Sequence, residues 1–251
     1  MLGGAIGSRM STGAMRTLLA TFVLLLLVGC TLSPPPLGSL PGEHVHTFVR
    51  LRTGSRAFPL AKEQRGAMFQ GHFDNMTRLA RAGELVVAGP YGVRKSADDL
   101  RGVFVLATDE PLRAQQLAET DPGFQQGEFR FEFTRFGTTA DLRAQLAADM
   151  AAADAITASG RTPKPGEGGR AYVWLWAGSY DAARQALGGE ARVLLWGRCA
   201  DGRGLLLLDA ADLDAAKALL APVVERLGVH ELDEWFGSGL LVELPRRTSG
   251  R

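Results

Sequence analysis

Two successive stretches of the chain show the same order of strand-like and helix-like patterns, and this repeat restricts the fold more than any other feature. In each stretch the apolar residues follow the order strand, helix, strand, strand, helix, strand, which is one of the recurring split-βαβ arrangements. Both helices of such a unit cover the same face of an antiparallel sheet. The other face stays bare, and a second unit in the same chain would supply its apolar cover.

The first stretch covers residues 43–137 and begins with a strand rich in Val, Phe and Thr at residues 45–51. A helix is expected at residues 66–82 because apolar side chains recur there at helical spacing, and Gly83 supplies its stop. The remaining elements are expected to be strands at residues 85–88, 102–108 and 129–134 and a helix at residues 112–119.

The second stretch covers residues 170–246. A linker at residues 138–169 precedes it and contains an Ala-rich helix at residues 139–158 and a Pro- and Gly-rich loop. The elements of the second stretch are expected to be strands at residues 171–177, 191–196, 204–208 and 240–244 and helices at residues 180–187 and 212–227. Leu195-Trp196-Gly197 holds the place that Val87-Ala88-Gly89 holds in the first stretch.

These patterns predict an α+β protein in which two ferredoxin-like βαββαβ units pack sheet to sheet as an intramolecular dimeric α+β barrel. Because each unit would cover the bare face of the other, we expect the chain to be a monomer. His230, Asp233 and Glu234 follow the expected long helix and are interpreted as a surface cluster, with a binding site as the alternative. Residues 247–251 are interpreted as a tail.

The N-terminal residues have the pattern of a targeting segment. Arg16 precedes an apolar run at residues 18–28, which is shorter than the roughly 20 residues that a transmembrane helix needs. The run ends in Leu27-Val28-Gly29-Cys30, which looks like the site at which a lipoprotein is cleaved and its cysteine acylated. We therefore expect a signal peptide at residues 1–29 and a lipid anchor on Cys30, with an ordinary cleaved signal as the alternative.

This N-terminus also predicts where the protein resides. Residues 30–42 are rich in proline and are expected to form an extended tether between the anchor and the first unit. The expected location is the periplasmic face of a membrane. Thr31 after the cysteine favours the outer membrane, because an Asp at that position would resemble an inner-membrane retention signal.

Several short motifs in the first stretch occur in a characteristic order, namely Gly71-His72-Phe73, Gly83-Glu84-Leu85-Val86-Val87-Ala88-Gly89-Pro90, Leu100-Arg101-Gly102 and Asp121-Pro122. Together they resemble the YciI-like (YCII-related) family over about a third of the chain. The last strand departs from the family pattern, which often ends in an aromatic pair where this chain has Thr134-Arg135-Phe136.

The resemblance implies a small enzyme that uses His72 and Asp121 as a catalytic pair, with Gly89, Pro90 and Arg101 at the substrate. The implied chemistry is proton abstraction, isomerisation or elimination on a small organic acid or phenol. The fold makes the pair reasonable, since antiparallel helices place the first half of one near the end of the other. A carboxylate beside an imidazole fixes its tautomer, which suits an acid–base catalyst.

Each of these residues also has a structural interpretation. Asp121 before a proline is a common helix stop that caps the next turn, and His72 is equally compatible with a packed core. Gly89-Pro90 is often only a turn, and Arg101 is compatible with a solvated strand end. The enzymatic role is therefore left open, beside a ligand-binding or accessory lipoprotein and a structural envelope protein.

Other classes of function find no support in the sequence. The net charge of +1, without a basic cluster, gives no indication of nucleic-acid binding. No cofactor motif or Ser-His-Asp arrangement is visible, and no metal ligand set is expected; His44 and His46, with His72, are only a weak metal candidate. Cys199 is interpreted as a small core residue, with a reactive thiol as the alternative. The small-molecule ligand is not identified by the sequence.

Overall fold

The computed structural model describes residues 35–56, 58–162, 164, 166–228 and 230–249. The expected signal peptide and the lipidation site Cys30 lie outside these residues. In the part of the chain that is described, no helix is long and apolar enough to cross a membrane.

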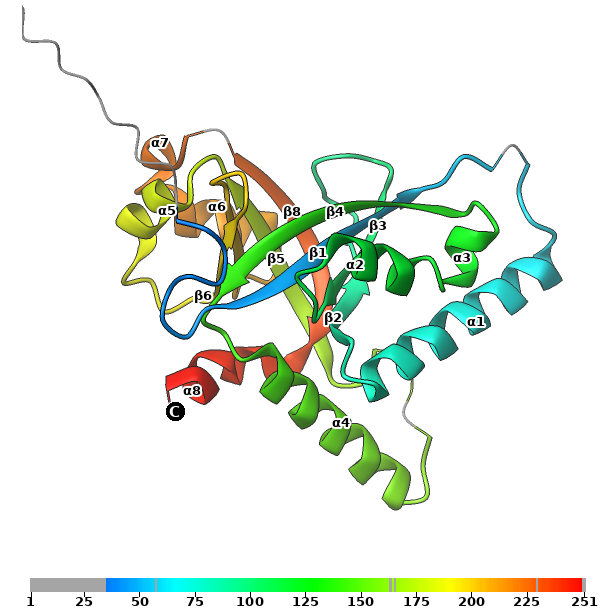
Figure 1. Ribbon diagram of the computed structural model, residues 1–251. Helices are drawn as coiled ribbons and strands as arrows, with labels where there is room; N and C mark the ends of the chain where they lie inside the picture. The colour runs from blue at the N-terminus through cyan, green and yellow to red at the C-terminus, as the bar shows by residue number, and fades with distance from the viewer. Residues whose placement is uncertain (1–34, 57, 163, 165, 229, 250–251) are drawn as a thin grey trace, which may run out of the picture. The chain divides into compact units, whose positions relative to one another are not determined.

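The described chain contains eight strands and eight α-helices in two halves that share one element order (Figure 1). The first half consists of β1 (His44–Thr53), α1 (Lys62–Arg81), β2 (Leu85–Pro90), β3 (Leu100–Leu106), α2 (Pro111–Ala118), α3 (Pro122–Gln125) and β4 (Phe129–Thr138). The linker forms α4 (Leu142–Ala158). The second half consists of β5 (Gly169–Ala177), α5 (Tyr180–Leu187), β6 (Val193–Cys199), β7 (Gly204–Leu208), α6 (Leu213–Leu220), α7 (Val224–Leu227) and β8 (His230–Ser238).

All eight strands belong to one open antiparallel sheet with the order β2-β3-β1-β4-β6-β7-β5-β8. The predicted α+β class is therefore confirmed. The two halves have equivalent strand orders and registers. Val87 lies opposite Val105 in the first half, and Leu195 lies opposite Leu207 in the second. A register shift precedes each of these pairs. The halves are joined edge to edge, because β4 pairs with β6.

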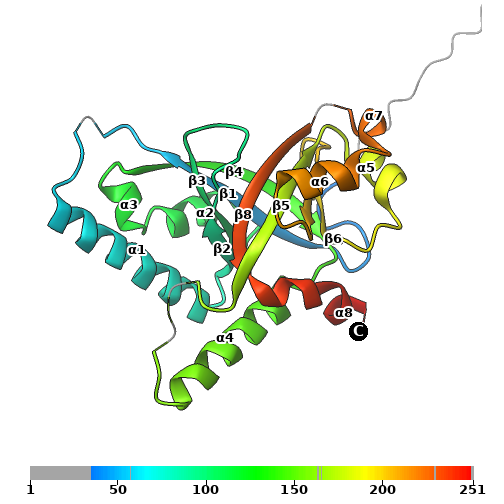
Figure 2. The same cartoon turned by 180° about the vertical axis from the view of Figure 1, so that it is seen from behind.

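The two end strands of the sheet approach each other at one point. Figures 1 and 2 both show β2 beside β8. Tyr91, just after β2, forms a bridge with Trp235 on β8. The amide of Gly92 donates to the carbonyl of Glu234 at 2.7 Å, and the amide of Glu234 donates to the carbonyl of Arg94 at 3.0 Å. This short contact, named here the β2–β8 seam, is a second connection between the two halves, in addition to the pairing of β4 with β6.

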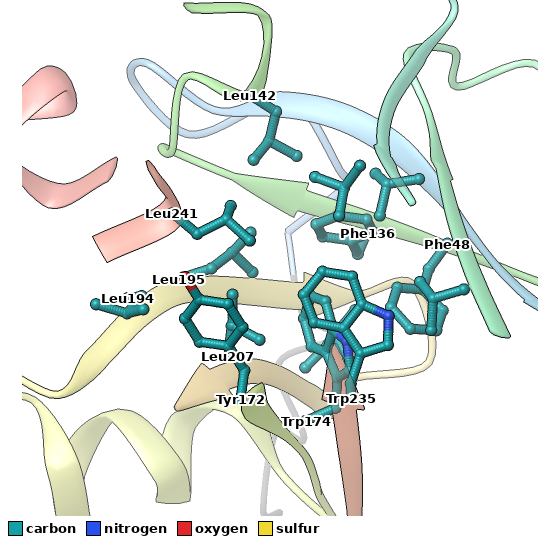
Figure 3. Packing of buried hydrophobic residues seen from close by; sticks show 14 of the residues in the cluster. Phe48, Phe136, Leu142, Tyr172, Trp174, Leu194, Leu195, Leu207, Trp235 and Leu241 are labelled. Carbon is teal, nitrogen blue, oxygen red and sulfur yellow. The ribbon is translucent and has the colours of Figure 1, made fainter. Parts of the chain in front are cut away.

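The largest core is built from strand residues of both halves together with Leu142 of α4 (Figure 3). Phe48 of β1 meets Trp174 of β5 edge to face, with ring centroids 5.1 Å apart. Phe136 and Trp235 are also fully or almost fully buried in this cluster. Aromatic side chains bury large apolar areas, so this contact shields apolar side chains of both halves from water. Separate apolar clusters lie under the helices of each half.

The C-terminal elements differ from the prediction. The last strand is β8 (His230–Ser238), whereas residues 240–244 lie in the 3₁₀ helix η1 (Gly239–Glu243) and the start of α8 (Leu244–Ser249). The Ser238 hydroxyl accepts a hydrogen bond from the amide of Leu240 and caps η1. The sequence of β8 contains charged residues at both inward and outward positions, so it lacks the alternation of apolar and polar residues that would have predicted a strand. The cluster interpretation of this segment was wrong in part, since Asp233 is completely buried.

Two further boundaries were also wrong. The helix expected at residues 212–227 is divided into α6 and α7, because Pro222 between them has no amide hydrogen to continue the helix. Strand β6 continues to Cys199 instead of ending at Trp196.

The described part of the tether is folded against the second half. Arg198 of β6 donates to the carbonyls of Pro35 and Pro36 and to the carboxylate of Glu43, which lies 2.8 Å away. Glu43 in turn accepts from the amide of Gly38 at 2.7 Å. The side chains of Arg198 and Glu43 are 6% and 3% exposed. The tether therefore departs from an extended chain at least from Pro35 onward.

Candidate acid–base site

The structure brings the two predicted catalytic residues together. Nδ1 of His72, in the middle of α1, lies 2.6 Å from Oδ2 of Asp121. His72 is 8% exposed and Asp121 is fully buried. A separation of this size is a short hydrogen bond with a charged partner. The predicted juxtaposition of His72 and Asp121 is therefore present.

Asp121 is held from two sides. It is the N-cap of α3, and its Oδ1 accepts from the amide of Gly123 at 2.7 Å. Its other oxygen faces His72. Asp121 therefore caps α3 with one carboxylate oxygen, as the structural interpretation expected, and contacts His72 with the other.

A glycine permits the approach of the two helices that carry the pair. A Cβ on Gly71 of α1 would lie only 3.1 Å from the ring of Pro122, the first residue of α3. This contact is tighter than an ordinary van der Waals contact. Gly71 therefore lets α1 lie close enough to α3 for the adjacent His72 to reach Asp121.

Four phenylalanines surround the His72 ring. Phe104 stacks on it with centroids 5.8 Å apart and planes 22° apart. The rings of Phe129 and Phe73 each lie 5.4 Å away, and that of Phe69 lies 6.4 Å away. This packing and the Asp121 hydrogen bond fix the orientation of the imidazole.

The hydrogen bond also determines which nitrogen is available for chemistry. In neutral His72 the proton belongs on Nδ1, which donates to the carboxylate, and Nε2 then carries the lone pair. No described residue provides a hydrogen-bond partner for Nε2. An imidazole held in this way can take up and release a proton at Nε2.

Two adjoining cavities lie between α1, β2, α4 and the end of β8. Their volumes are about 530 and 710 Å³. We name them together the α1–α4 groove; Figures 1 and 2 show α4 next to the C-terminal end of α1. The residues that line both cavities are Met76, Ala88, Asp149, Ala153 and Ser238. His72 lines neither cavity, whereas its neighbour Phe73 lines the larger one.

The structure places only some of the other predicted binding residues at the groove. Gly89 and Pro90 line the larger cavity. Gly89 also has a structural role, since a Cβ there would lie 2.0 Å from the carbonyl oxygen of Phe236. Arg101 lies outside the groove and donates to the carbonyl of Asp98 at 2.9 Å. The solvated interpretation therefore fits Arg101 better than a ligand contact.

His44 and His46 do not form a metal site with His72 in the structure. His46 is buried in β1 beside Phe136. Burial, followed by the charges of His44 and Arg143, lowers the pKa of His46 to about 4. Among the described residues, no group of three or more His, Cys, Asp or Glu side chains could hold a metal ion.

Cys199 is a core residue. It is 1% exposed, and burial raises the pKa of its thiol to about 12. A thiol with this pKa remains protonated at neutral pH and is a poor nucleophile. The predicted core interpretation is confirmed.

The sequence reasoning missed a buried polar contact between the halves. Oδ1 of Asp233 accepts from the amide of Ser96 at 2.6 Å, next to the β2–β8 seam. Arg50 pairs with Glu231 at 2.9 Å and lies over the ring of Trp176 at 4.2 Å. These residues are far apart in the sequence, and no local pattern connects them.

A scan against protein-family models, a search of curated proteins and a search of solved structures found no match to this chain. The resemblance to YciI-like proteins therefore stays a prediction, carried by the motifs around His72, Gly89 and Asp121.

Proposed function

We propose that this protein is a membrane-anchored lipoprotein with a YciI-like domain, in which His72 and Asp121 perform acid–base chemistry on a small molecule. The observation that carries the proposal is the 2.6 Å contact between Nδ1 of His72 and the buried carboxylate of Asp121. Lipidation of Cys30 provides the anchor.

In this proposal Nε2 of His72 is the group that exchanges a proton with the substrate. The neutral imidazole accepts a proton from an acidic O–H or C–H group, and the resulting imidazolium lies against the carboxylate of Asp121. The same nitrogen then returns the proton to the product. Asp121 acts as a positioning residue that selects the tautomer and holds the ring.

We further propose that the two halves are ferredoxin-like units that form an intramolecular counterpart of a dimeric α+β barrel. Their equivalent strand orders and registers support this proposal. So does the contact between the helix-free faces at Phe48 and Trp174. The second half lacks counterparts of His72 and the Asp-Pro motif, so its role is to cover the first half and to border the α1–α4 groove.

A second candidate function is ligand binding without turnover. It is favoured by the position of His72, which is 8% exposed and does not line the groove. Cavities of 530 and 710 Å³ are large enough for small ligands. If the protein binds a ligand without turnover, the hydrogen bond between His72 and Asp121 has only a structural role, holding α1 against α3.

Solvent-proton exchange tests the catalytic proposal. A panel of small organic acids and phenols is incubated in D₂O with the protein, and deuterium incorporation is followed by NMR. We expect exchange in at least one compound and a loss of about 100-fold or more in His72→Gln. His230→Gln, which changes a histidine outside the pair, should retain the rate. Exchange that is unchanged in His72→Gln would contradict the proposal, and absence of exchange together with groove-dependent binding would favour the second function.

A further inference from the structure

We propose that Phe73 is the gate between the α1–α4 groove and His72, and that the groove takes an uncharged, largely apolar small molecule. This inference rests on the proposed function and specifies the substrate class and the access route of the same site. It follows from two observations: the position of Phe73, and the charge and pairing of the polar groups in the groove.

Phe73 contacts the His72 ring and also lines the groove. Its ring lies 5.4 Å from the His72 ring at an interplanar angle of 60°, and it lines the larger cavity. Phe73 is 46% exposed, whereas His72 is 8% exposed. A ring that is half in solvent loses little packing when it changes rotamer. Rotation of Phe73 away from His72 would therefore uncover the imidazole on the side of the groove.

The polar side chains that line the groove are mostly bonded to other protein groups. Ser238 donates to Asp149 at 2.5 Å. The other pairs are Arg81 with Asp154, Glu167 with Arg161, Thr77 with the carbonyl of Phe73 and Thr157 with the carbonyl of Ala153. Among the described residues, Arg81 is the only cationic side chain in the lining.

This arrangement selects against an anionic ligand. The lining contains the carboxylates of Asp149, Asp154 and Glu167 but only one guanidinium, that of Arg81, which is already paired. A carboxylate ligand would lose its hydration without gaining a cationic partner. Most of the remaining side chains in the lining are apolar, among them Phe73, Met76, Leu146, Met150 and Ile156. An uncharged molecule with a large apolar surface fits these walls.

Chemical modification of His72 tests the gate without a known substrate. Diethyl pyrocarbonate acylates an accessible, unprotonated imidazole nitrogen and releases ethanol and carbon dioxide. The purified full chain is treated with the reagent, and modification of the His72 peptide is followed by mass spectrometry. We expect slow reaction of His72, about tenfold faster reaction in Phe73→Ala and slower reaction in Phe73→Trp.

Phe133→Ala is the matched control. Phe133 is 42% exposed, close to the value for Phe73, and its ring contacts Phe131 and not His72. The reaction rate of His72 in this variant should equal that of the wild type. Phe73→Leu, which keeps an apolar side chain on α1, covers the case in which Phe73→Ala does not fold. A His72 rate that is unchanged in Phe73→Ala, or in Phe73→Leu if Phe73→Ala does not fold, would overturn the gate.

The ligand class is tested with three probes of similar size, namely 4-methylphenol, 4-methylbenzoate and 4-methylbenzylammonium. In Phe73→Ala, we expect 4-methylphenol to slow the modification of His72 most, and Ile156→Arg to abolish this protection. Stronger protection by either charged probe would overturn the proposed ligand class. These outcomes are separate from the proposed function, because loss of proton exchange in His72→Gln does not depend on which residue gates the site.

Discussion

Asp121 connects two parts of the first half at the level of single atoms. One carboxylate oxygen caps α3 through the amide of Gly123, and the other holds His72. Since the residue is fully buried, neither partner has water as a substitute. The same side chain therefore contributes to stability and to the orientation of the candidate catalytic imidazole.

Asp121→Ala should lower the free energy of unfolding by about 2–6 kcal/mol, because two buried donors lose their acceptor at roughly 1–3 kcal/mol each. Asp121→Asn keeps an acceptor for the Gly123 amide and should cost less. Urea denaturation measures both variants. Asp181→Ala, at an exposed position on α5, is the control. Equal stabilities of Asp121→Ala and Asp181→Ala would contradict this role.

His46 should make the stability depend on pH. Its pKa is lowered to about 4 in the folded protein, mainly by burial, whereas an unfolded histidine has a pKa of about 6.5. The unfolded chain therefore binds the extra proton first as the pH falls. The stability contributed by His46 is complete above pH 6.5 and is lost between pH 6.5 and 4, by about 2 kcal/mol at pH 5.

This dependence is checked by urea denaturation at pH 7 and pH 5. His46→Gln cannot take up the proton and should lose about 2 kcal/mol less than the wild type between the two pH values. The prediction is wrong if the wild type and the variant show the same change.

The residues of the site differ in how far the sequence predicted them. His72 and Asp121 were predictable because each lies in a short motif, and the expected antiparallel helices placed them together. The burial of His72 depends on the packing of Phe104 and Phe129, which lie on other elements. Such contacts leave no pattern in the local sequence.

At the level of elements, the β2–β8 seam depends on close backbone approach. Gly89 on β2 faces the carbonyl of Phe236 on β8, where a Cβ would lie 2.0 Å from the oxygen. The two amide hydrogen bonds of Gly92 and Glu234 continue the contact. A side chain at Gly89 would push the two end strands apart at the edge of the α1–α4 groove.

Gly89→Ala should lower the stability by about 1–3 kcal/mol, the usual cost of overpacking. It should also speed the hydrogen exchange of the Gly92 and Glu234 amides. Thermal unfolding and amide exchange measure the two effects. Gly66→Ala is the matched control, because a Cβ at Gly66 of α1 meets no atom within 4 Å and alanine favours a helix. A fully stable Gly89→Ala with unchanged exchange would exclude the close-approach role.

Helices and strands were predictable where the apolar residues of a segment follow one clear spacing, either that of a helix or that of a strand. Helix α5 begins and ends at the predicted residues, and the Ser179 hydroxyl caps it by accepting from the amide of Ala182. Strand β8 escaped prediction because its inward side chains include the charged Asp233, whose contacts with Ser96 and Arg50 connect residues far apart in the sequence. Local polarity therefore suggested a surface segment.

For the whole molecule, the repeat predicted two similar halves with a shared core but not their edge-to-edge pairing through β4 and β6. That pairing involves few residues, with Phe136 opposite Cys199 and Gly137 opposite Arg198. The same edge receives the tether through Arg198 and Glu43.

Replacement of Cys30 tests the anchor. Cys30→Ala should move the protein from the membrane fraction to the soluble fraction after cell lysis, because the acylated thiol is lost. Mass spectrometry of the wild-type N-terminal peptide should show a modified Cys30 as its first residue. Cys199→Ala, which removes a buried thiol, should remain in the membrane fraction. Membrane association that persists in Cys30→Ala would contradict lipid anchoring.

The central claim is that His72 and Asp121 form an oriented acid–base pair. Long-range ¹H–¹⁵N NMR of the His72 ring tests it most directly, since the ¹⁵N shifts distinguish the two tautomers. We predict a protonated Nδ1 and an unprotonated Nε2 in the neutral wild type, with this preference weakened in Asp121→Asn. A neutral His72 that carries its proton on Nε2 would contradict the account, because the carboxylate would then not be the acceptor that positions the ring.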